Sequence, residues 1–300
     1  MIVRKRITYS QNFLKNKALV SDLVNKSSIT NEDIVYEIGA GQGIITQELL
    51  KKAKKVIAFE IDRNLFNKLA QRFENERLLE LRLENFLTHS LPSYSYKVFS
   101  NIPFNITSEV IKKLTQARNP PEDTYLIVQK EAAKKFVGKP IDIKNSQISI
   151  LLKSLFELSI FYEFMHYDFF PKPNVDAVLL RIKKRKKPLV QHKNKESYEN
   201  FIVYAFNQFK SNVSKGLSDI YGKKVILKLS KELGFSPTSK PSELDIKDWI
   251  GLFTYFLNKI DNKHKSVVKD SYKKQLTQEK KLNKIHRTRI NKDWKKYIKL

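Results

Sequence analysis

The feature that most constrains the fold is a regular alternation of strand-like and helix-like segments over the first 185 or so residues. Short apolar runs predict strands at 34–39, 55–61, 79–83, 96–100 and 125–128. Helices are predicted between them, from the glycine-rich loop to residue 50, at 63–74 and at 108–117. Two further runs, 157–164 and 175–182, are typical of a β-hairpin pair around a loop that contains proline. A repeat of strand, helix and strand predicts an α/β fold, with a parallel sheet covered on both faces.

The basic run KKRKKP at 183–188 ends this pattern, and we place a domain boundary there, which gives a first domain over 1–188. Residues 189–260 contain only helix-like stretches, at 198–208, 224–233 and 245–258, and form a predicted small helical domain. Gly234 is a plausible stop for the second of these helices. Ser242 and Asp245 resemble a capping pair for the third helix.

The chain is strongly basic, with 57 Lys and Arg residues against 31 Asp and Glu and a formal charge of +26. Such an excess indicates a polyanionic partner, either nucleic acid or an anionic membrane surface, although a Lys-rich soluble protein is the alternative. Residues 261–300 hold 14 Lys and Arg against 4 Asp and Glu, so +10 of the charge lies in this extension. We interpret it as an arm that contacts an RNA backbone and orders on binding; the alternative is a solvated basic tail.

Several function classes are excluded by composition. The chain has no Cys, which rules out disulfides, Cys-ligated zinc and any thiolate nucleophile, and so disfavours methylation at C5 of a pyrimidine. The five His residues show no ligand spacing, and no metal is predicted. The basic start lacks the apolar stretch of a signal peptide, and no apolar run approaches the ~20 residues of a membrane span. We therefore expect a cytoplasmic protein without a membrane partner.

A glycine-rich loop, Glu37-Ile-Gly39-Ala-Gly41-Gln-Gly43, follows the first strand and opens a helix. Glycines at Gly39 and Gly41 permit a tight turn and a close approach of the backbone to a ligand. The spacing differs from that of dinucleotide-binding loops, so a nicotinamide enzyme is less favoured. Glu60 ends the second strand beside this loop, where a carboxylate can accept both ribose hydroxyls. With Glu37 and without a P-loop lysine, the pattern suits S-adenosylmethionine, an adenosine whose far end is cationic.

A second constellation follows the later strands of the predicted sheet. Asn85 comes after the third strand, where its amide can meet the adenine edge of the cofactor. Asn101-Ile-Pro103-Phe104 follows the fourth strand. The amine N6 of adenine is a poor nucleophile because its lone pair is delocalised into the ring. The Asn101 side-chain oxygen and a backbone carbonyl can accept both N–H groups and free that lone pair, while Phe104 stacks on the extruded base.

These motifs resemble those of the ribosomal RNA adenine N6-methyltransferases, a family that includes the Erm proteins and the KsgA-type enzymes. The resemblance is close over residues 8–185 and loose over 190–260. It rests on motifs that stand in family order: YSQNFL, YEIGAGQG, FEID, ENFL, SNIPFNIT, VQKEAAKKF and FFPKPNVDAVLLRI. It implies a Rossmann-like class I methyltransferase fold, with a mostly parallel seven-stranded sheet and a small C-terminal helical domain.

The resemblance also implies roles for single residues in cofactor binding. Asn12 and Leu14 are expected to contact S-adenosylmethionine from the N-terminal segment. Gly39 is expected to line the methionine pocket, and Glu60 to hold the ribose. Asn85 stands where the family usually has Asp, so the position keeps an acceptor but loses a charge.

For catalysis, the resemblance points to three residues. Asn101 and Phe104 fall on the family's catalytic Asn and aromatic residue, and Asn101 is also expected to contact the cofactor. Phe104 is Tyr in many members, so a hydroxyl is absent here. Phe169 matches the aromatic residue proposed to clamp the target base from its other face.

The choice of RNA is less constrained. The segment HYDFFPKPNVD and the basic extension favour the Erm branch, which modifies 23S rRNA and confers resistance to macrolide, lincosamide and streptogramin B antibiotics. The segment FNQFKSN (206–212) has a faint likeness to the KsgA-type enzymes, which act on 16S rRNA. A non-catalytic RNA-binding or transcription factor on the same fold, and DNA adenine methylation, are the remaining alternatives. We expect a monomer whose partner is ribosomal RNA.

Overall fold

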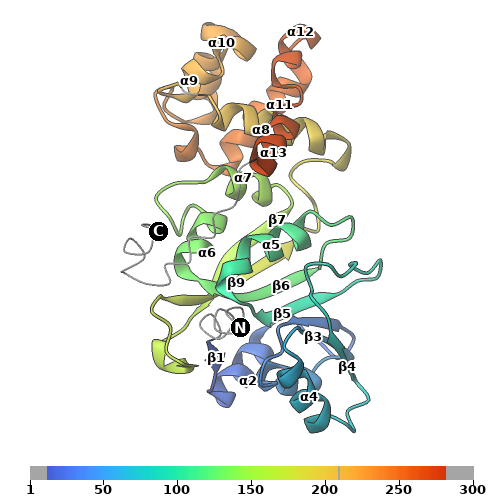
Figure 1. The fold of residues 1–300 in the computed structure, drawn as a ribbon. Coiled ribbons are helices and arrows are strands. Elements are labelled where there is room, and N and C mark those ends of the chain that lie inside the picture. Colours follow the sequence, from blue (N-terminus) through green and yellow to red (C-terminus); the bar gives the residue numbers. More distant parts are fainter. Residues whose placement is uncertain (1–11, 209, 282–300) are drawn as a thin grey trace, which may run out of the picture.

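The computed structural model describes residues 12–208 and 210–281 (Figure 1). Within these residues the main sheet has seven strands in the order β4-β3-β2-β5-β6-β9-β7. Their bounds are β2 Ile34–Ile38, β3 Lys55–Glu60, β4 Leu79–Leu83, β5 Lys97–Asn101, β6 Asp123–Gln129, β7 Phe156–Glu163 and β9 Ala177–Lys184. A separate pair joins β1 (Phe13–Leu14) to β8 (Phe169–Phe170).

The first five strands of this order, β4, β3, β2, β5 and β6, pair in parallel. β9 lies antiparallel between β6 and β7. Each strand predicted from the sequence is present, and its ends lie within two residues of the expected positions. The mostly parallel α/β sheet and the antiparallel pairing of the last two runs are therefore confirmed.

Helices cover both faces of the sheet. Successive side chains of a strand point to opposite faces, so both faces of these apolar strands must be covered. In β3, Val56 and Ala58 pack in one core cluster, whereas Ile57 and Phe59 pack in the cluster on the opposite face. One face is covered by α2 Lys17–Lys26, α3 Ile44–Leu50 and α4 Arg63–Arg72. The other face is covered by α5 Thr107–Thr115, α6 Lys130–Val137 and α7 Gln147–Lys153.

A helical region with its own apolar core lies at one end of the molecule, away from β1 and α2 (Figure 1). Its helices are α8 Lys195–Phe206, α9 Val213–Gly216, α10 Ser218–Leu233, α11 Ile246–Lys259, α12 Asn262–Lys265 and α13 Ser271–Lys281. Gly234 ends α10 in the left-handed conformation, as predicted, and its N–H donates to the Ser230 carbonyl. Asp245 caps α11 with Asp248 rather than with Ser242, so the expected partner was wrong.

Part of the basic extension folds back onto the body of the protein. In α13 the Tyr272 hydroxyl accepts a hydrogen bond from Gln116 after α5, and Gln275 bonds with Gln147 of α7. The expectation of an arm that orders only on binding is therefore wrong for the helical stretch up to residue 281, because intramolecular partners already hold it. Residues 282–300, which carry the rest of that prediction, lie outside the described residues.

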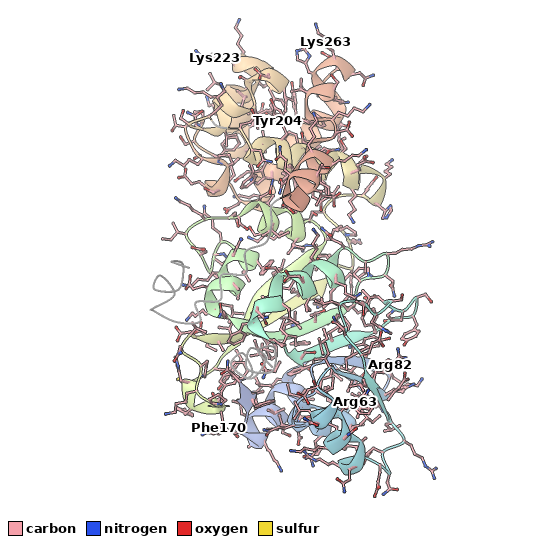
Figure 2. The ribbon with its side chains drawn as sticks, in the orientation of Figure 1. Arg63, Arg82, Phe170, Tyr204, Lys223 and Lys263 are labelled. Carbon is pink, nitrogen blue, oxygen red and sulfur yellow. The ribbon has the colours of Figure 1, made fainter. Side chains whose placement is uncertain are left out.

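No helix in the described part of the chain is both long and apolar enough to cross a membrane. Charged side chains instead project from the surface at many places, and Lys223 and Lys263 stand at the outer end of the helical region (Figure 2).

Candidate active site

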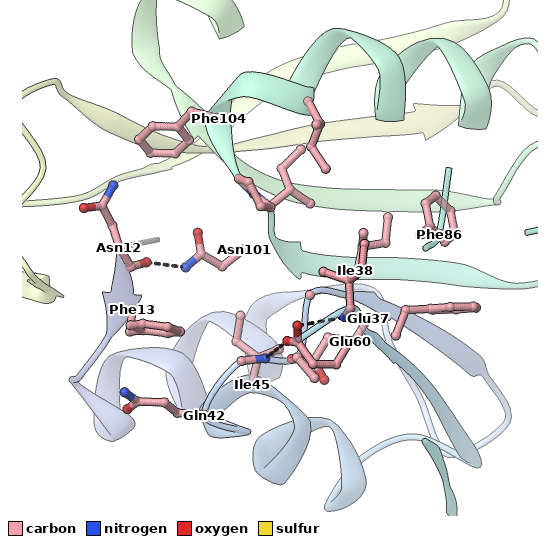
Figure 3. Close-up of a pocket in the computed structure, with 18 of the residues that line it drawn as sticks. Asn12, Phe13, Glu37, Ile38, Gln42, Ile45, Glu60, Phe86, Asn101 and Phe104 are labelled. Atoms are coloured by element: carbon pink, nitrogen blue, oxygen red, sulfur yellow. Dashed lines mark hydrogen bonds between the residues drawn. The ribbon is translucent and has the colours of Figure 1, made fainter. Parts of the chain in front are cut away.

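A pocket of about 390 Å³ opens at the carboxyl edge of the parallel strands. The loops after β2, β3, β4 and β5 line it, and the N-terminal segment closes one side (Figure 3). Parallel strands end on the same edge of a sheet, so motifs that are far apart in the sequence meet here. All of the predicted cofactor residues lie on this pocket: Asn12, Leu14, Gly39, Gly41, Glu60, Asn85 and Asn101.

The glycine-rich loop brings the two predicted constellations together. Gly39 has φ +76°, and a Cβ atom at this residue would lie 3.9 Å from the Asn101 carbonyl oxygen. Gly41 has φ +58°, and a Cβ atom there would lie 3.0 Å from the ring of Phe13. Both positions favour glycine, because L side chains rarely adopt a positive φ, and at Gly41 the space is also limited. The loop therefore lies directly against the turn that carries Asn101.

Glu60 is buried at the end of β3, with only 3% of its surface exposed. One carboxylate oxygen accepts the Gly41 N–H at 2.8 Å. The other oxygen accepts the N–H groups of Ile61 and Asp62 at 2.8 and 2.9 Å. Three backbone donors therefore fix the carboxylate on the pocket, and the lone pair that remains on Oε2 can accept a hydroxyl group.

Glu37 is a second buried carboxyl group on the same pocket. Its Oε2 accepts the Thr46 hydroxyl at 2.6 Å. Burial raises the pKa of Glu37 to about 8, and the nearby charge of Glu60 acts in the same direction. Near pH 7 this carboxyl group is therefore mostly protonated. A cation placed beside it would favour the ionised form.

Asn85 lies at the outer wall of the pocket, in the loop after β4. Its Oδ1 accepts the Leu87 N–H at 3.0 Å, and its carbonyl accepts the Thr88 N–H. One lone pair of Oδ1 thus stabilises the turn of Asn85 itself. The amide N–H groups and the second lone pair are left for the pocket.

Asn101 ends β5 in an orientation that a hydrogen bond determines. Its Nδ2 donates to the Asn12 carbonyl at 2.7 Å (Figure 3). Because the amide nitrogen faces this acceptor, Oδ1 is left as an acceptor on the side of the pocket. Phe104 begins the short helix that follows, and its ring lies half-buried above Asn101 (Figure 3). This geometry can hold a donor such as an exocyclic amine beneath an aromatic ring.

The N-terminal segment lines the pocket with Asn12 and Leu14, which the resemblance pointed to, and with Phe13, which it did not. Asn12 acts through its backbone carbonyl, and Leu14 is buried with 3% of its surface exposed. Phe13 and Phe86 also line the pocket. Phe13 lies in the motif YSQNFL, whose residues 9–11 are outside the described residues. Nothing in the local pattern indicates which of these side chains faces the pocket.

Phe169 does not lie on the pocket, and its expected role as a clamp on the target base is wrong in this structure. The side chain is only 1% exposed and belongs to a core cluster. Its ring makes an edge contact with Phe164 at 5.3 Å between centroids. Strand β8 pairs with β1 in a register that places Phe169 beside the buried Leu14, so both side chains face the core. A ring without a free face cannot stack on a base.

Among the described residues, no group of three or more His, Asp or Glu side chains could hold a metal ion. His166, the one histidine close to the loop of Phe169, instead bonds Pro173 and Asp176 within that loop.

The doubly covered sheet, with a glycine-rich loop and an acidic side chain at its carboxyl edge, defines a Rossmann-like methyltransferase fold. Two solved structures share the fold. The 23S rRNA methyltransferase ErmE superposes with a TM-score of 0.77 at 24% identity, over 82% of this chain and 100% of that chain. A dimethyladenosine transferase from Plasmodium falciparum gives a TM-score of 0.66 at 24% identity, over 82% and 98%.

Sequence comparison identifies the family. A family model described as ribosomal RNA adenine dimethylase matches residues 2–259. A relative from Mycoplasmopsis synoviae, named ribosomal RNA small subunit methyltransferase A, is 33% identical over 248 residues, or 82% of this chain and 94% of the relative. An rRNA adenine N-6-methyltransferase from Bacteroides fragilis is 29% identical over 254 residues, or 84% and 94%. The chain belongs to the ribosomal RNA adenine dimethylase family and is an enzyme of the rRNA adenine methyltransferase type.

The burial of Phe169 leads to a prediction about stability. We expect Phe169→Ala to lower the free energy of unfolding by about 3–5 kcal/mol, because it leaves a cavity in the core. Urea unfolding of the purified proteins measures this change, with Phe170→Ala as the matched control, since Phe170 is 70% exposed. A Phe169→Ala protein as stable as the wild type would contradict the structural role.

Proposed function

We propose that this chain transfers the methyl group of S-adenosylmethionine to N6 of an adenine in ribosomal RNA. The observation that supports this most directly is that Glu60, the glycine-rich loop and Asn101 line one pocket. A donor held by the first two would therefore lie next to an amine held by the third. The transfer requires this proximity, since no covalent enzyme intermediate is involved.

The residues present fit the proposed cofactor. The Glu60 carboxylate is placed to accept a ribose hydroxyl, and the Asn85 amide can donate to a ring nitrogen of the adenine. Gly39 and Gly41 leave space for the chain that follows the ribose. Glu37 lies where a cationic group would find a negative partner once the carboxyl is ionised. S-adenosylmethionine supplies the activated methyl group.

At the target base, Asn101 provides the main chemical contribution. Its Oδ1 accepts one N–H of the adenine amine and a backbone carbonyl accepts the other, which draws the nitrogen lone pair out of the ring system. Phe104 stacks on the base and holds it in line with the methyl group. Bound S-adenosylmethionine would supply the methyl group at this point, and the amine would lose a proton to water as it accepts that group.

For the RNA itself, we propose 23S rRNA, with resistance to macrolide, lincosamide and streptogramin B antibiotics as the consequence. The loop sequence FFPKPNV and the basic extension, which lies beyond the 2–259 match, support this choice. The small-subunit names of several relatives favour 16S rRNA as the second candidate. Expression in a drug-sensitive bacterium, with mapping of methylated adenines in both RNAs, separates the two. The cytoplasmic location and the monomeric state stay predictions.

We expect Asn101→Ala to retain cofactor binding and to lose most methyl transfer, because the amine loses its oriented acceptor. Removing one such preorganised contact typically lowers kcat by about 10²- to 10³-fold. Transfer of labelled methyl groups to ribosomal RNA measures the rate, and calorimetry checks the cofactor affinity. The same variant is the control for the resistance experiment, in which it should leave the bacterium drug-sensitive. Turnover at the wild-type rate would refute the role of Asn101.

Cofactor binding should release protons near pH 7, because a bound cation lowers the raised pKa of Glu37. We expect the release of roughly one proton per cofactor. Calorimetry in phosphate and in Tris, which differ in ionisation enthalpy, measures it. Glu37→Gln is expected to bind without this dependence on the buffer. The raised pKa also means that wild-type stability falls as the pH rises from about 4.5 to about 8, a slope that Glu37→Gln should reduce. A binding enthalpy independent of the buffer would contradict the prediction.

Deletion of 282–300 should weaken binding to ribosomal RNA and reduce its salt dependence. This segment holds 7 Lys and Arg against 1 Asp, and the cut leaves α13 intact. Each phosphate contact that is lost should reduce the slope of log affinity against log salt by ~0.7–0.9. A full-length variant with the seven basic residues changed to Gln separates charge from length. An unchanged slope in both variants would exclude the contribution of this segment.

A further inference from the structure

The loop between β7 and β9 is firmly held yet exposes large apolar side chains. Met165, Tyr167 and Phe170 are 57%, 61% and 70% exposed. Single exposed apolar residues are common on protein surfaces, but three within six residues mark a candidate interaction surface. We call this segment, residues 164–176, the aromatic loop.

Hydrogen bonds fix the base of the aromatic loop. The Lys15 N–H donates to the Asp168 carbonyl at 3.0 Å, and the Met165 N–H donates to the Asp168 carboxylate at 2.9 Å. His166 lies within hydrogen-bonding distance of the Pro173 carbonyl and of the Asp176 carboxylate, at 2.8 and 2.9 Å. The exposed rings are therefore presented by an ordered frame, which lowers the entropic cost of binding through them.

The pairing of β1 with β8 determines where Phe170 points. Phe13 is the direct partner of Phe170, and Leu14 is the partner of Phe169. Directly paired residues of antiparallel strands share a face of the ladder. Leu14 and Phe169 face the core, so Phe13 and Phe170 share the opposite face. Phe13 lines the pocket, and its strand partner Phe170 lies beside it, on an outer edge of the molecule (Figure 2).

Lysine residues flank this pair of strands in the sequence. Lys15 and Lys17 follow β1, Lys172 follows β8, and all three are exposed. An exposed aromatic ring beside lysines is the combination with which proteins bind single-stranded nucleic acid, since the ring stacks on a base while the lysines contact phosphates. The target adenine itself is already provided with an aromatic partner, Phe104, inside the pocket.

We propose that Phe170 stacks on an unpaired RNA base next to the target adenine. This inference rests on the proposed function and adds to it a requirement on the substrate: the neighbour of the target must be splayed out of a helix. Phe104 holds the base that reacts, and Phe170 holds the adjacent base. The enzyme thereby discriminates against adenines whose neighbours are stacked in a duplex.

The experiment uses the full chain and a ribosomal RNA hairpin that the wild-type enzyme methylates. Phe170→Ala is expected to raise KM for the hairpin by about 5- to 150-fold, the usual range for loss of one stacked base, with little change in kcat. Phe170→Trp should retain the wild-type KM. Ile143→Ala is the matched control, because Ile143 is 84% exposed and lies in the loop between α6 and α7. Thermal unfolding and cofactor affinity should match the wild type in all three variants.

A second set of hairpins identifies the stacked base. An abasic site is placed at each neighbour of the target in turn. At one neighbour the abasic site should raise the KM of the wild-type enzyme by the same factor as Phe170→Ala does. The abasic site and Phe170→Ala together should then raise KM no further than either change alone. Additive effects at every neighbour, or a KM for Phe170→Ala equal to that of the wild type, would overturn the proposal. A wild-type enzyme that methylates neither 16S nor 23S RNA fragments would instead refute the proposed function.

Discussion

The parallel pairing of β2, β3, β4 and β5 is the constraint on which the site depends. Parallel strands force their carboxyl ends to one edge, so four loops that are far apart in the sequence must share one space. The hydrogen bond from Asn101 to the Asn12 carbonyl then orients the Asn101 amide within that space. It joins Asn12, just before β1, to the end of β5. It also leaves Oδ1 of the Asn101 amide as an acceptor on the side of the pocket. The sheet provides the proximity, and a single backbone carbonyl provides the orientation.

The two buried carboxyl groups of the pocket, Glu37 and Glu60, differ in the hydrogen bonds that hold them. Glu60 is held by three backbone N–H donors, which stabilise a negative charge in a buried place. Glu37 accepts one hydroxyl hydrogen bond, and burial raises its pKa. Two ionised carboxylates side by side would repel each other in a medium of low dielectric constant. The pocket therefore holds one carboxylate fixed by backbone donors and a second carboxyl group whose pKa is raised by burial. This arrangement suits the proposed cofactor, which combines a diol with a positive charge.

Much of the fold followed from the sequence, because each strand is a short apolar run bounded by polar or glycine-rich turns. The short helices α6 and α7 were not assigned, since eight and seven residues are too few to establish a period of 3.6. Gly39, Glu60, Asn85 and Asn101 were predictable because they stand at or just after strand ends, whereas Asn12 and Leu14 followed only from the family resemblance. The burial of Phe169 was not predictable, because the sequence contains two adjacent phenylalanines and only one faces the core. Pairing with Phe13 and Leu14, more than 150 residues earlier, determines which of the two rings faces the core. No local sequence pattern indicates this choice.

The parts of the chain that distinguish one RNA from another lie outside the shared sheet. On the proposed function, the pocket accounts for the reaction of an adenine amine but not for the choice of RNA. Discrimination would then fall to what surrounds the pocket, namely the aromatic loop and the helical region. Helix α13 fastens that region to the sheet through Gln116 and Gln147, although it follows the part of the chain that the family model matches. These two hydrogen bonds join the helical region to the helices that cover the sheet. An RNA that touched both the helical region and the pocket would have to match both surfaces.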